Sequence, residues 1–359
     1  MKNFLKNIFK IKYKFSFPER KNILIYDQHS EKTLKKIINS DYSIINCRKE
    51  KIFLPILLIT ILKNYSNFFK QFYFNYLKEL IKYHNPKKIV TIVDNDIGFY
   101  KLKKYFNNVK FISIQNGYRF YKNDLFQKIS ESNENYLCDE FYCFGNNVEN
   151  FLKNKIKAKY YSIGSLKNNF CLNIMEKKSN EVCFISSYGI TNFKSEKFII
   201  DFLGEFCVKY NLNLSILART TKAEEREFYN SLVKRIEFKY YNQTDEFCNS
   251  YNVLDRSILS ISLNNTLGYE NIARGNKTFF FLTNDRNTGC SSFLKFGYPE
   301  EFKKEIIFCT KSLEKKIISE KINKVFSMSS VEWNEISKPI IKNIISYDEN
   351  NKFLLKNLM

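Results

Sequence analysis

The residues whose types and spacing best fit a chemical task lie at the start of a predicted helix late in the chain. An apolar run, 258–261, predicts a buried strand, Asn264 and Asn265 interrupt it, and Thr266 can cap a following helix. In a parallel sheet, ligands bind beyond the carboxyl ends of the strands, and the N–H groups at a helix start attract anions. The residues predicted to hold a phosphate there are Ser262, Asn265, Thr266, Leu267 and Gly268.

Glu270 lies one turn into the same helix, where its carboxylate can accept hydrogen bonds from the two hydroxyls of a ribose. Phosphate and ribose together indicate a nucleotide. The alternative is that Thr266 only caps the helix and Glu270 only favours its first turn, as acids there often do. Arg219 follows the predicted strand 213–217 and would face the same anion, although most arginines are simply solvated surface residues.

Two acids, Asp94 and Asp96, follow the predicted strand 88–93 in the first half of the chain. An ionised carboxylate there can take a proton from an acceptor hydroxyl as a general base. The alternative is an ordinary turn in which Asp96 caps the next helix. Asp27, at the end of the first predicted strand, is a weaker candidate of the same kind, and His29 beside it stays open.

Two further polar groups end strands of the first half, at 115–119 and 164–169. Amides can orient sugar hydroxyls, and the forked donors of arginine suit a carboxylate or a phosphate. An Asn-Gly turn is also common for conformational reasons alone. The residues predicted to bind an acceptor are Gln115, Asn116, Gly117, Arg119, Ser165 and Lys167.

Predicted strands alternate with helices along most of the chain, which indicates βαβ units and parallel sheets. A polar gap divides the pattern into two similar runs, so we predict an α/β protein with two Rossmann-like domains facing across a cleft, followed by C-terminal helices. The predicted divisions are a basic amphipathic segment at 1–21, an acceptor domain at 22–170, a linker at 171–180, a donor domain at 181–330 and helices at 331–359.

The composition limits the classes of function. The chain has 359 residues, 44% of them hydrophobic, and a formal net charge of +21, which favours polyanions such as nucleic acid, an anionic bilayer or phosphate-bearing substrates. Signature motifs of P-loop NTPases, zincins and serine hydrolases are absent, as is any run of 18 or more apolar residues. Nine scattered cysteines without a Cys-x-x-Cys pair predict reduced, mostly buried thiols in a cytoplasm and no metal site.

The segment 1–17 carries five lysines, no acid and bulky apolar residues between the lysines. This pattern is typical of a helix lying in the interface of an anionic membrane, with its lysines extended towards the headgroups. It is equally typical of a frayed basic tail. The predicted location is cytoplasmic, with peripheral contact to the inner face of the cytoplasmic membrane through these residues.

Taken in order, the strand ends resemble those of GT-B fold glycosyltransferases of bacterial surface and capsular carbohydrate biosynthesis. The resemblance runs over both halves, to about Phe281. The segments that carry it are Ile92-Val-Asp-Asn-Asp96, Phe111-Ile-Ser-Ile-Gln-Asn-Gly-Tyr-Arg119, Phe144-Gly-Asn146, Ile163-Gly-Ser-Leu-Lys-Asn-Asn169, Ile216-Leu-Ala-Arg219 and Asn265-Thr-Leu-Gly-Tyr-Glu270.

This resemblance implies a nucleotide-sugar donor on the second domain, an acceptor on the first, and neither an obligatory metal nor another cofactor. It implies that 266–268 hold the donor phosphate, Glu270 the ribose, and Arg219 the charge that grows on the leaving group. Many relatives have His-Gly where this chain has Asn116-Gly117, which moves the prediction for the general base to Asp94 or Asp96.

Three functions remain in competition. The first is transfer of a sugar from a nucleotide-sugar donor to a glycan or glycolipid acceptor, as in surface polysaccharide or lipopolysaccharide. The second is a sugar-nucleotide 2-epimerase, which shares the fold. The third is a basic scaffold that binds nucleic acid or membrane without catalysis; the sequence contains no recognised nucleic-acid-binding module, so no nucleic acid partner is predicted.

Overall fold

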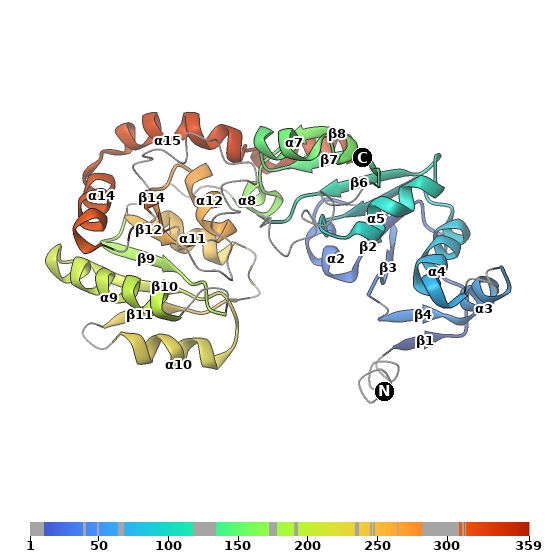
Figure 1. Cartoon of the computed structure of the whole chain (residues 1–359), viewed down its shortest axis with the longest axis horizontal. Helices are drawn as coiled ribbons and strands as arrows, with labels where there is room; N and C mark the ends of the chain where they lie inside the picture. The colour runs from blue at the N-terminus through green and yellow to red at the C-terminus, as the bar shows by residue number, and fades with distance from the viewer. Residues whose placement is uncertain are drawn as a thin grey trace.

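The structure is a computed structural model, and Figure 1 shows its chain as two α/β domains side by side, bridged at one edge by late helices. The described residues are 11–38, 41–48, 50–63, 68–117, 134–171, 178–189, 193–233, 237–244, 246, 248–263, 265–281, 309–310, 312 and 314–358. Each domain is built on a sheet of six parallel strands.

The N-terminal sheet has the order β3-β2-β5-β6-β7-β8. Its central strands are continuous apolar runs, because helices cover both faces of a parallel sheet. Its strands are β2 (Ile23–Tyr26), β3 (Tyr42–Ile45), β5 (Lys88–Thr91), β6 (Lys110–Ile114), β7 (Tyr136–Cys143) and β8 (Ile156–Ser162). Its helices are α2 (Gln28–Leu34), α3 (Leu54–Lys63), α4 (Phe68–His84), α5 (Ile97–Leu102), α7 (Asn146–Leu152) and α8 (Leu166–Phe170).

The C-terminal sheet has the order β11-β10-β9-β12-β13-β14, so the chain changes direction across the sheet between β9 and β12. Ligands of open parallel sheets bind at such a switch point. The strands are β9 (Glu181–Ile185), β10 (Asn213–Leu217), β11 (Phe238–Tyr241), β12 (Leu259–Ser262), β13 (Thr278–Phe281) and β14 (Cys309–Thr310). The helices are α9 (Phe193–Lys209), α10 (Ala223–Leu232), α11 (Asn249–Arg256), α12 (Thr266–Ala273) and α14 (Lys315–Ser327).

The last helices return the chain to the first domain. Helix α15 (Ser330–Ile344) runs along the top of the C-terminal domain towards α7 in Figure 1, with the Trp333 side chain buried against the core. Helix α16 (Lys352–Leu358) packs Leu354 against the apolar face of the N-terminal sheet. The predicted fold class, two Rossmann-like domains with C-terminal helices, is therefore confirmed.

Neither alternative for 1–17, an interfacial helix or a frayed tail, holds where the structure describes the segment. Lys12–Lys14 form a strand, β1, that pairs in parallel with β4 (Lys51–Phe53). The backbone groups of an edge strand accept a partner strand, and the alternation of apolar residues and lysine over 11–15 suits this pairing. Residues 1–10 lie outside the described part of the chain.

The expectation of free thiols throughout is also wrong for one pair. Cys171, at the end of α8, forms a disulfide with Cys248, which precedes α11. The two lie 77 residues apart, and only the docking of α8 against the second domain brings them together. Five of the six free cysteines that the structure describes are buried, as predicted, and Cys47 is partly exposed.

No helix within the described residues is both long enough and apolar enough to cross a bilayer. The same residues contain no group of three or more His, Cys, Asp or Glu side chains arranged to hold a metal ion.

Candidate functional site

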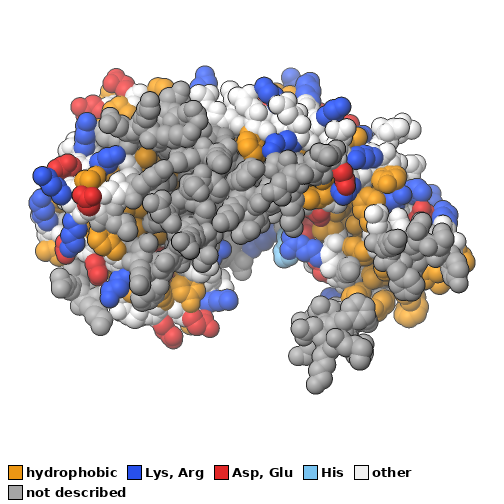
Figure 2. All heavy atoms as spheres, in the orientation of Figure 1, with side chains coloured by type: hydrophobic (Ala, Val, Ile, Leu, Met, Phe, Trp, Pro, Cys, Tyr) orange, Lys and Arg blue, Asp and Glu red, His pale blue; other side chains and the backbone are white. Residues whose placement is uncertain are grey.

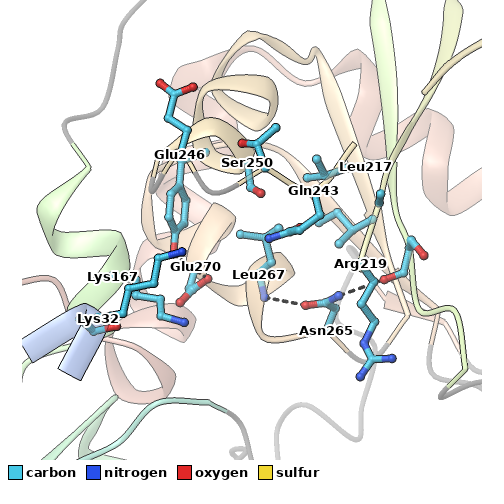
Figure 3. A pocket seen from close by; sticks show the side chains of 16 residues that line it. Lys32, Lys167, Leu217, Arg219, Gln243, Glu246, Ser250, Asn265, Leu267 and Glu270 are labelled. Atoms are coloured by element: carbon cyan, nitrogen blue, oxygen red, sulfur yellow. Dashed lines mark hydrogen bonds between the residues drawn. The ribbon is translucent and has the colours of Figure 1, made fainter. Parts of the chain in front are cut away.

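A cavity of about 330 Å³ lies at the carboxyl edge of the C-terminal sheet, where the topology predicts a ligand. Its floor comes from the ends of β9 and β10, and its walls from the start of α12, from α11 and from the segment after β11. Lys32 of α2 and Lys167 of α8 reach it from the N-terminal side. The predicted residues that line it are Lys167, Arg219, Asn265, Leu267 and Glu270 (Figure 3).

Helix α12 begins one residue earlier than the sequence predicts. Asn265, rather than Thr266, is the N-cap, and its side-chain oxygen accepts a hydrogen bond from the Leu267 N–H at 3.0 Å. Its amide nitrogen donates to the Ser186 carbonyl oxygen at 3.1 Å, at the end of β9. Asparagine caps as well as threonine does, so composition alone could not choose between neighbours. The second hydrogen bond fixes the cap to the central strand of the sheet.

Two of the predicted phosphate-binding residues, Ser262 and Gly268, lie behind the cavity. A Cβ atom at Gly268 would lie 2.5 Å from the Ser262 Oγ atom and 2.9 Å from a ring carbon of Phe280. Gly268 therefore allows α12 to pack directly on β12 and β13. Thr266 lies on another side of the helix start, where its Oγ1 atom is 3.4 Å from the position of a Cβ atom on Gly117.

Glu270 lines the cavity from inside α12, with 5% of its surface exposed. One carboxylate oxygen accepts a hydrogen bond from the Ser165 hydroxyl, and the other accepts one from the Tyr251 hydroxyl at 3.1 Å. Burial raises the pKa of Glu270, while the Ser165 hydrogen bond and the charge of Lys167 act in the opposite direction. Both ribose-accepting oxygens of the predicted site are thus already hydrogen-bonded, one of them across the domain boundary.

Cationic side chains stand on two sides of this cavity. Figure 3 shows Lys32 and Lys167 beside Glu270, with Arg219 on the opposite side and Asn265 and Leu267 between. The guanidinium of Arg219 donates to the Tyr188 carbonyl oxygen at 2.7 Å, and its backbone N–H donates to Glu225 at 2.8 Å. These bonds orient an exposed arginine at the cavity rim.

The two predicted general bases lie outside the cavity. Asp96 caps α5: one oxygen accepts from the Gly98 N–H at 2.7 Å and the other from the Tyr26 hydroxyl at 3.0 Å. The capping alternative for Asp96 is therefore the one that the structure adopts. Asp94 is fully buried, and its carboxylate accepts from the Asn116 N–H at 3.4 Å.

The loop after β6 approaches the start of α12. Gln115 is buried and holds the loop, donating to the Gly117 carbonyl oxygen at 3.1 Å and accepting from the Phe144 N–H at 2.8 Å. Asn116 is exposed, and Gly117 lies close to the Thr266 hydroxyl across the boundary. The structure thus gives Gln115 a positioning role in the loop. Arg119 lies outside the described residues.

Sequence reasoning missed several residues that line the cavity. Lys32 belongs to α2, which follows the central strand β2, and Tyr251 belongs to α11. Gln243 and Ser250 complete the wall after β11. Lys32 lies in the last turn of α2 rather than at its start, so the position of the helix after a strand gave no signal for it.

Two parallel-sheet domains facing each other, with a polar cavity at the carboxyl edge of the second, define the GT-B class of fold. Similar solved structures include UDP-GlcNAc 2-epimerase from Neisseria meningitidis bound to UDP-GlcNAc, with 11% identity, a TM-score of 0.55, and 94% of this chain and 98% of that chain covered. A glycosyltransferase from Rickettsia africae has 14% identity and a TM-score of 0.51, with 95% and 97% covered. UDP-GlcNAc 2-epimerase from Methanocaldococcus jannaschii has 11% identity and a TM-score of 0.54, with 94% and 98% covered.

The sequence profile of one family, described as "putative O-antigen biosynthesis protein", matches residues 112–359. The match covers more than half of the chain, and the protein belongs to this family. No curated protein matches the sequence. The resemblance to GT-B proteins of bacterial surface carbohydrate biosynthesis is thereby confirmed.

Proposed function

We propose that the protein is a glycosyltransferase that moves a sugar from a nucleotide-sugar donor to a surface polysaccharide or lipopolysaccharide acceptor. One observation carries the proposal: the cavity at the carboxyl edge of the second sheet combines a helix start with cationic side chains from both domains. A helix start and cations both favour the negative charge that develops on a departing nucleoside diphosphate.

In this proposal, Arg219, Lys32 and Lys167 stabilise the diphosphate, and the start of α12 contributes its N–H groups. Glu270 accepts the ribose hydroxyls after giving up its hydrogen bonds from Ser165 and Tyr251. Because the cations supply the positive charge, the reaction is proposed to need no metal. We expect transfer to continue when a chelator is present.

The acceptor is proposed to bind on the N-terminal side, near Asn116 and Gly117. Asp94 is the stronger of the two candidate bases, because Asp96 serves as the cap of α5, whereas Asp94 adjoins the loop that meets α12. Asp94 is buried, so the loop at 115–117 would have to move for its carboxylate to reach an acceptor hydroxyl. Cytoplasmic location and peripheral contact with the membrane belong to the same proposal.

A thermal-shift screen against UDP, GDP, dTDP and CMP tests the donor site. A nucleotide at about 100 times its Kd stabilises the protein by roughly 2.7 kcal/mol, and one nucleotide should stand out. Arg219→Ala should reduce that shift, whereas Arg226→Ala, an exposed arginine on α10 that does not line the cavity, should leave it unchanged. Equal shifts in both variants would remove Arg219 from the site.

A 2-epimerase is the second candidate, favoured by the similarity of the fold to the two 2-epimerases. The two reactions differ in what they need. A transferase releases free nucleoside diphosphate in proportion to added acceptor, whereas an epimerase changes the donor sugar without any acceptor. Incubation with UDP-GlcNAc alone, followed by chromatography of the sugar, separates them.

A further inference from the structure

A second cavity, of about 670 Å³, lies in the N-terminal domain and shares helix α2 with the first cavity. Strands β1 and β4, the edge strand β3 and α2 surround it, and we name it the β1–β4 cavity. Gln28 and Glu31 of α2 line the β1–β4 cavity, whereas Lys32 and Thr33 of the same helix line the first. A ligand that lies along α2 can therefore contact both cavities.

Three lysines line one part of the β1–β4 cavity: Lys12 and Lys14 of β1, and Lys51 of β4. Because side chains alternate along a strand, Lys12 and Lys14 project from the same face of β1, and Lys51 is the register partner of Lys12. Like charges in such a position repel each other across a strand pair. Burial lowers the pKa of Lys51, and the charges of Lys14 and Lys12 act in the same direction. The three lysines therefore cost stability unless a negative charge lies nearby.

The two carboxylates that line the cavity are bonded to other groups. Glu31 accepts a hydrogen bond from the Tyr42 hydroxyl at 3.2 Å, and Glu50 accepts one from the Arg48 N–H at 3.1 Å. Within the described part of the chain, the three lysines form no ion pair with a carboxylate. An anionic ligand would supply the negative charge that these lysines lack.

Most of the remaining lining is polar. Gln28 and Asn46 contribute side-chain amides, and Ser43 contributes a hydroxyl. Amides and hydroxyls donate and accept hydrogen bonds, which are the bonds that sugar hydroxyls form. Sites for small organic ligands have volumes of roughly 300–1,000 Å³. The β1–β4 cavity therefore has room for a sugar ring as well as for the charged group that the ring carries.

Helix α2 connects the β1–β4 cavity with the first cavity. It has seven residues and is about 10 Å long. Figure 1 shows α2 on the side of the N-terminal domain that faces the second domain, and Figure 2 shows a hollow between the two domains with basic side chains at its edge. A glycan whose end lies at the first cavity can therefore run past α2 and place a later sugar unit in the β1–β4 cavity.

We propose that the β1–β4 cavity binds an acidic sugar unit of the acceptor glycan, one that carries a carboxylate or a phosphate, while the end of the same glycan lies at the first cavity. This inference rests on the proposed transfer reaction and adds the class of acceptor, an acidic glycan. The lysines bind the negative charge, and the amides orient the hydroxyls. A neutral glycan would leave the repulsion between the lysines in place, and a bare anion would leave the amides without a role.

Isothermal titration calorimetry with the full chain tests the proposal. The acidic probes are tetragalacturonate and glucose 6-phosphate, and the neutral probe is maltotetraose. The variant Lys12→Ala/Lys14→Ala/Lys51→Ala is compared with Lys197→Ala/Lys316→Ala/Lys324→Ala, which removes the same charge from exposed positions of the second domain that line neither cavity. One exposed charge pair contributes up to about fivefold in affinity, so the first variant should bind tetragalacturonate about tenfold more weakly than the second.

The stability of the first variant gives an independent readout, because its substitutions also remove the repulsion between the lysines. Without a ligand, this variant should unfold in urea at least as late as the unsubstituted protein, although it binds the uronate more weakly. Loss of both stability and binding would assign the lysines a purely structural role and overturn the proposal. If the triple variant does not fold, Lys14→Ala replaces it, since Lys14 is exposed and pairs in register with Phe53. Unchanged affinity in that variant would also overturn the proposal.

The remaining outcomes separate the possible ligands. Equal affinity of the two triple variants for tetragalacturonate would refute the proposal, as would maltotetraose binding as tightly as the uronate. Inorganic phosphate that competes as well as glucose 6-phosphate at constant ionic strength would assign the lysines to a bare anion. Tighter binding of an oligothymidylate, lost in the first variant, would assign them to nucleic acid.

The thermal-shift screen with nucleotides distinguishes failure of this inference from failure of the proposed function. A protein that no nucleotide stabilises would refute the transfer reaction itself. A nucleotide shift without binding of either acidic probe would refute only the acidic acceptor.

Discussion

Replacing Gly268 with alanine tests the packing that fixes the start of α12. The added Cβ atom would lie 2.5 Å from the Ser262 Oγ atom, 2.6 Å from the Ser262 Cβ atom and 2.9 Å from a ring carbon of Phe280. All three atoms are buried, and a contact this short forces a shift of α12 away from the sheet.

The magnitude follows from two opposing effects. Overpacking of a buried position costs about 1–3 kcal/mol and occasionally more. Alanine in a helix gains about 1 kcal/mol over glycine. Gly204→Ala, within α9 of the same domain, provides the matched control, because it makes the same chemical change in a helix. We expect Gly204→Ala to be neutral or stabilising and Gly268→Ala to lower the free energy of unfolding by up to about 2 kcal/mol net.

Chemical denaturation measures the free energy of unfolding of both variants. A double mutant tests whether the contact with Ser262 causes the loss. Ser262→Gly removes the two closest atoms, so it should restore part of the stability that Gly268→Ala loses, as a coupling energy of at least about 0.5 kcal/mol. Gly268→Ala should also weaken nucleotide binding, because the helix start lines the cavity. Equal stability of the Gly268→Ala and Gly204→Ala variants would refute the packing argument.

Three further predictions concern buried charge and the disulfide. Burial raises the pKa of Glu270 in the folded state, so the contribution of Glu270 to stability is present at low pH and is lost as the pH rises through the folded pKa. Glu270→Gln should remove this pH dependence from the free energy of unfolding, measured by denaturation at a series of pH values. Arg274→Met leaves Asp255 buried without its ion pair and should cost about 3–5 kcal/mol in urea unfolding, part of which Asp255→Leu should restore. Reductant should lower the free energy of unfolding by about 4.5 kcal/mol, because it frees the 77-residue loop that the Cys171–Cys248 disulfide closes in the unfolded chain. It should have no such effect on Cys171→Ser.

The sequence predicts the fold well because both halves repeat a strong local signal. Buried parallel strands are apolar runs, and polar residues collect where they end, so the strands that end at Asp94, Gln115 and Arg219 could be placed from the chain alone. Strand β1 could not, because it has only three residues and its partner β4 is about 40 residues away, although Lys12, Tyr13 and Lys14 alternate as in a strand. Short edge strands depend on such tertiary pairing.

The site was predictable only in part, because the sequence does not determine which side chains of a loop point into the cavity. The sequence identifies the loop at 262–268, but only packing separates Asn265 and Leu267, which line the cavity, from Ser262 and Gly268, which lie behind it. Lys32 enters the cavity from another domain, and no spacing in the chain relates it to Arg219.

In the proposed donor site, the contact between Ser165 and Glu270 would link ligand binding to the arrangement of the domains. Ser165 caps α8 on the first domain, and its hydroxyl donates to a carboxylate of the second. Arg274, one turn beyond Glu270, donates to the side-chain oxygen of Asn168 at 3.0 Å and to the Cys171 carbonyl oxygen at 2.7 Å, so the same helix is tied to α8 at two levels. A ribose that takes the Ser165 position exchanges one hydrogen bond for another, which changes the free energy little. The Arg274 contacts and the disulfide would then hold the domains together while the Glu270 contact is exchanged, so the site can open for a ligand without separating its two halves.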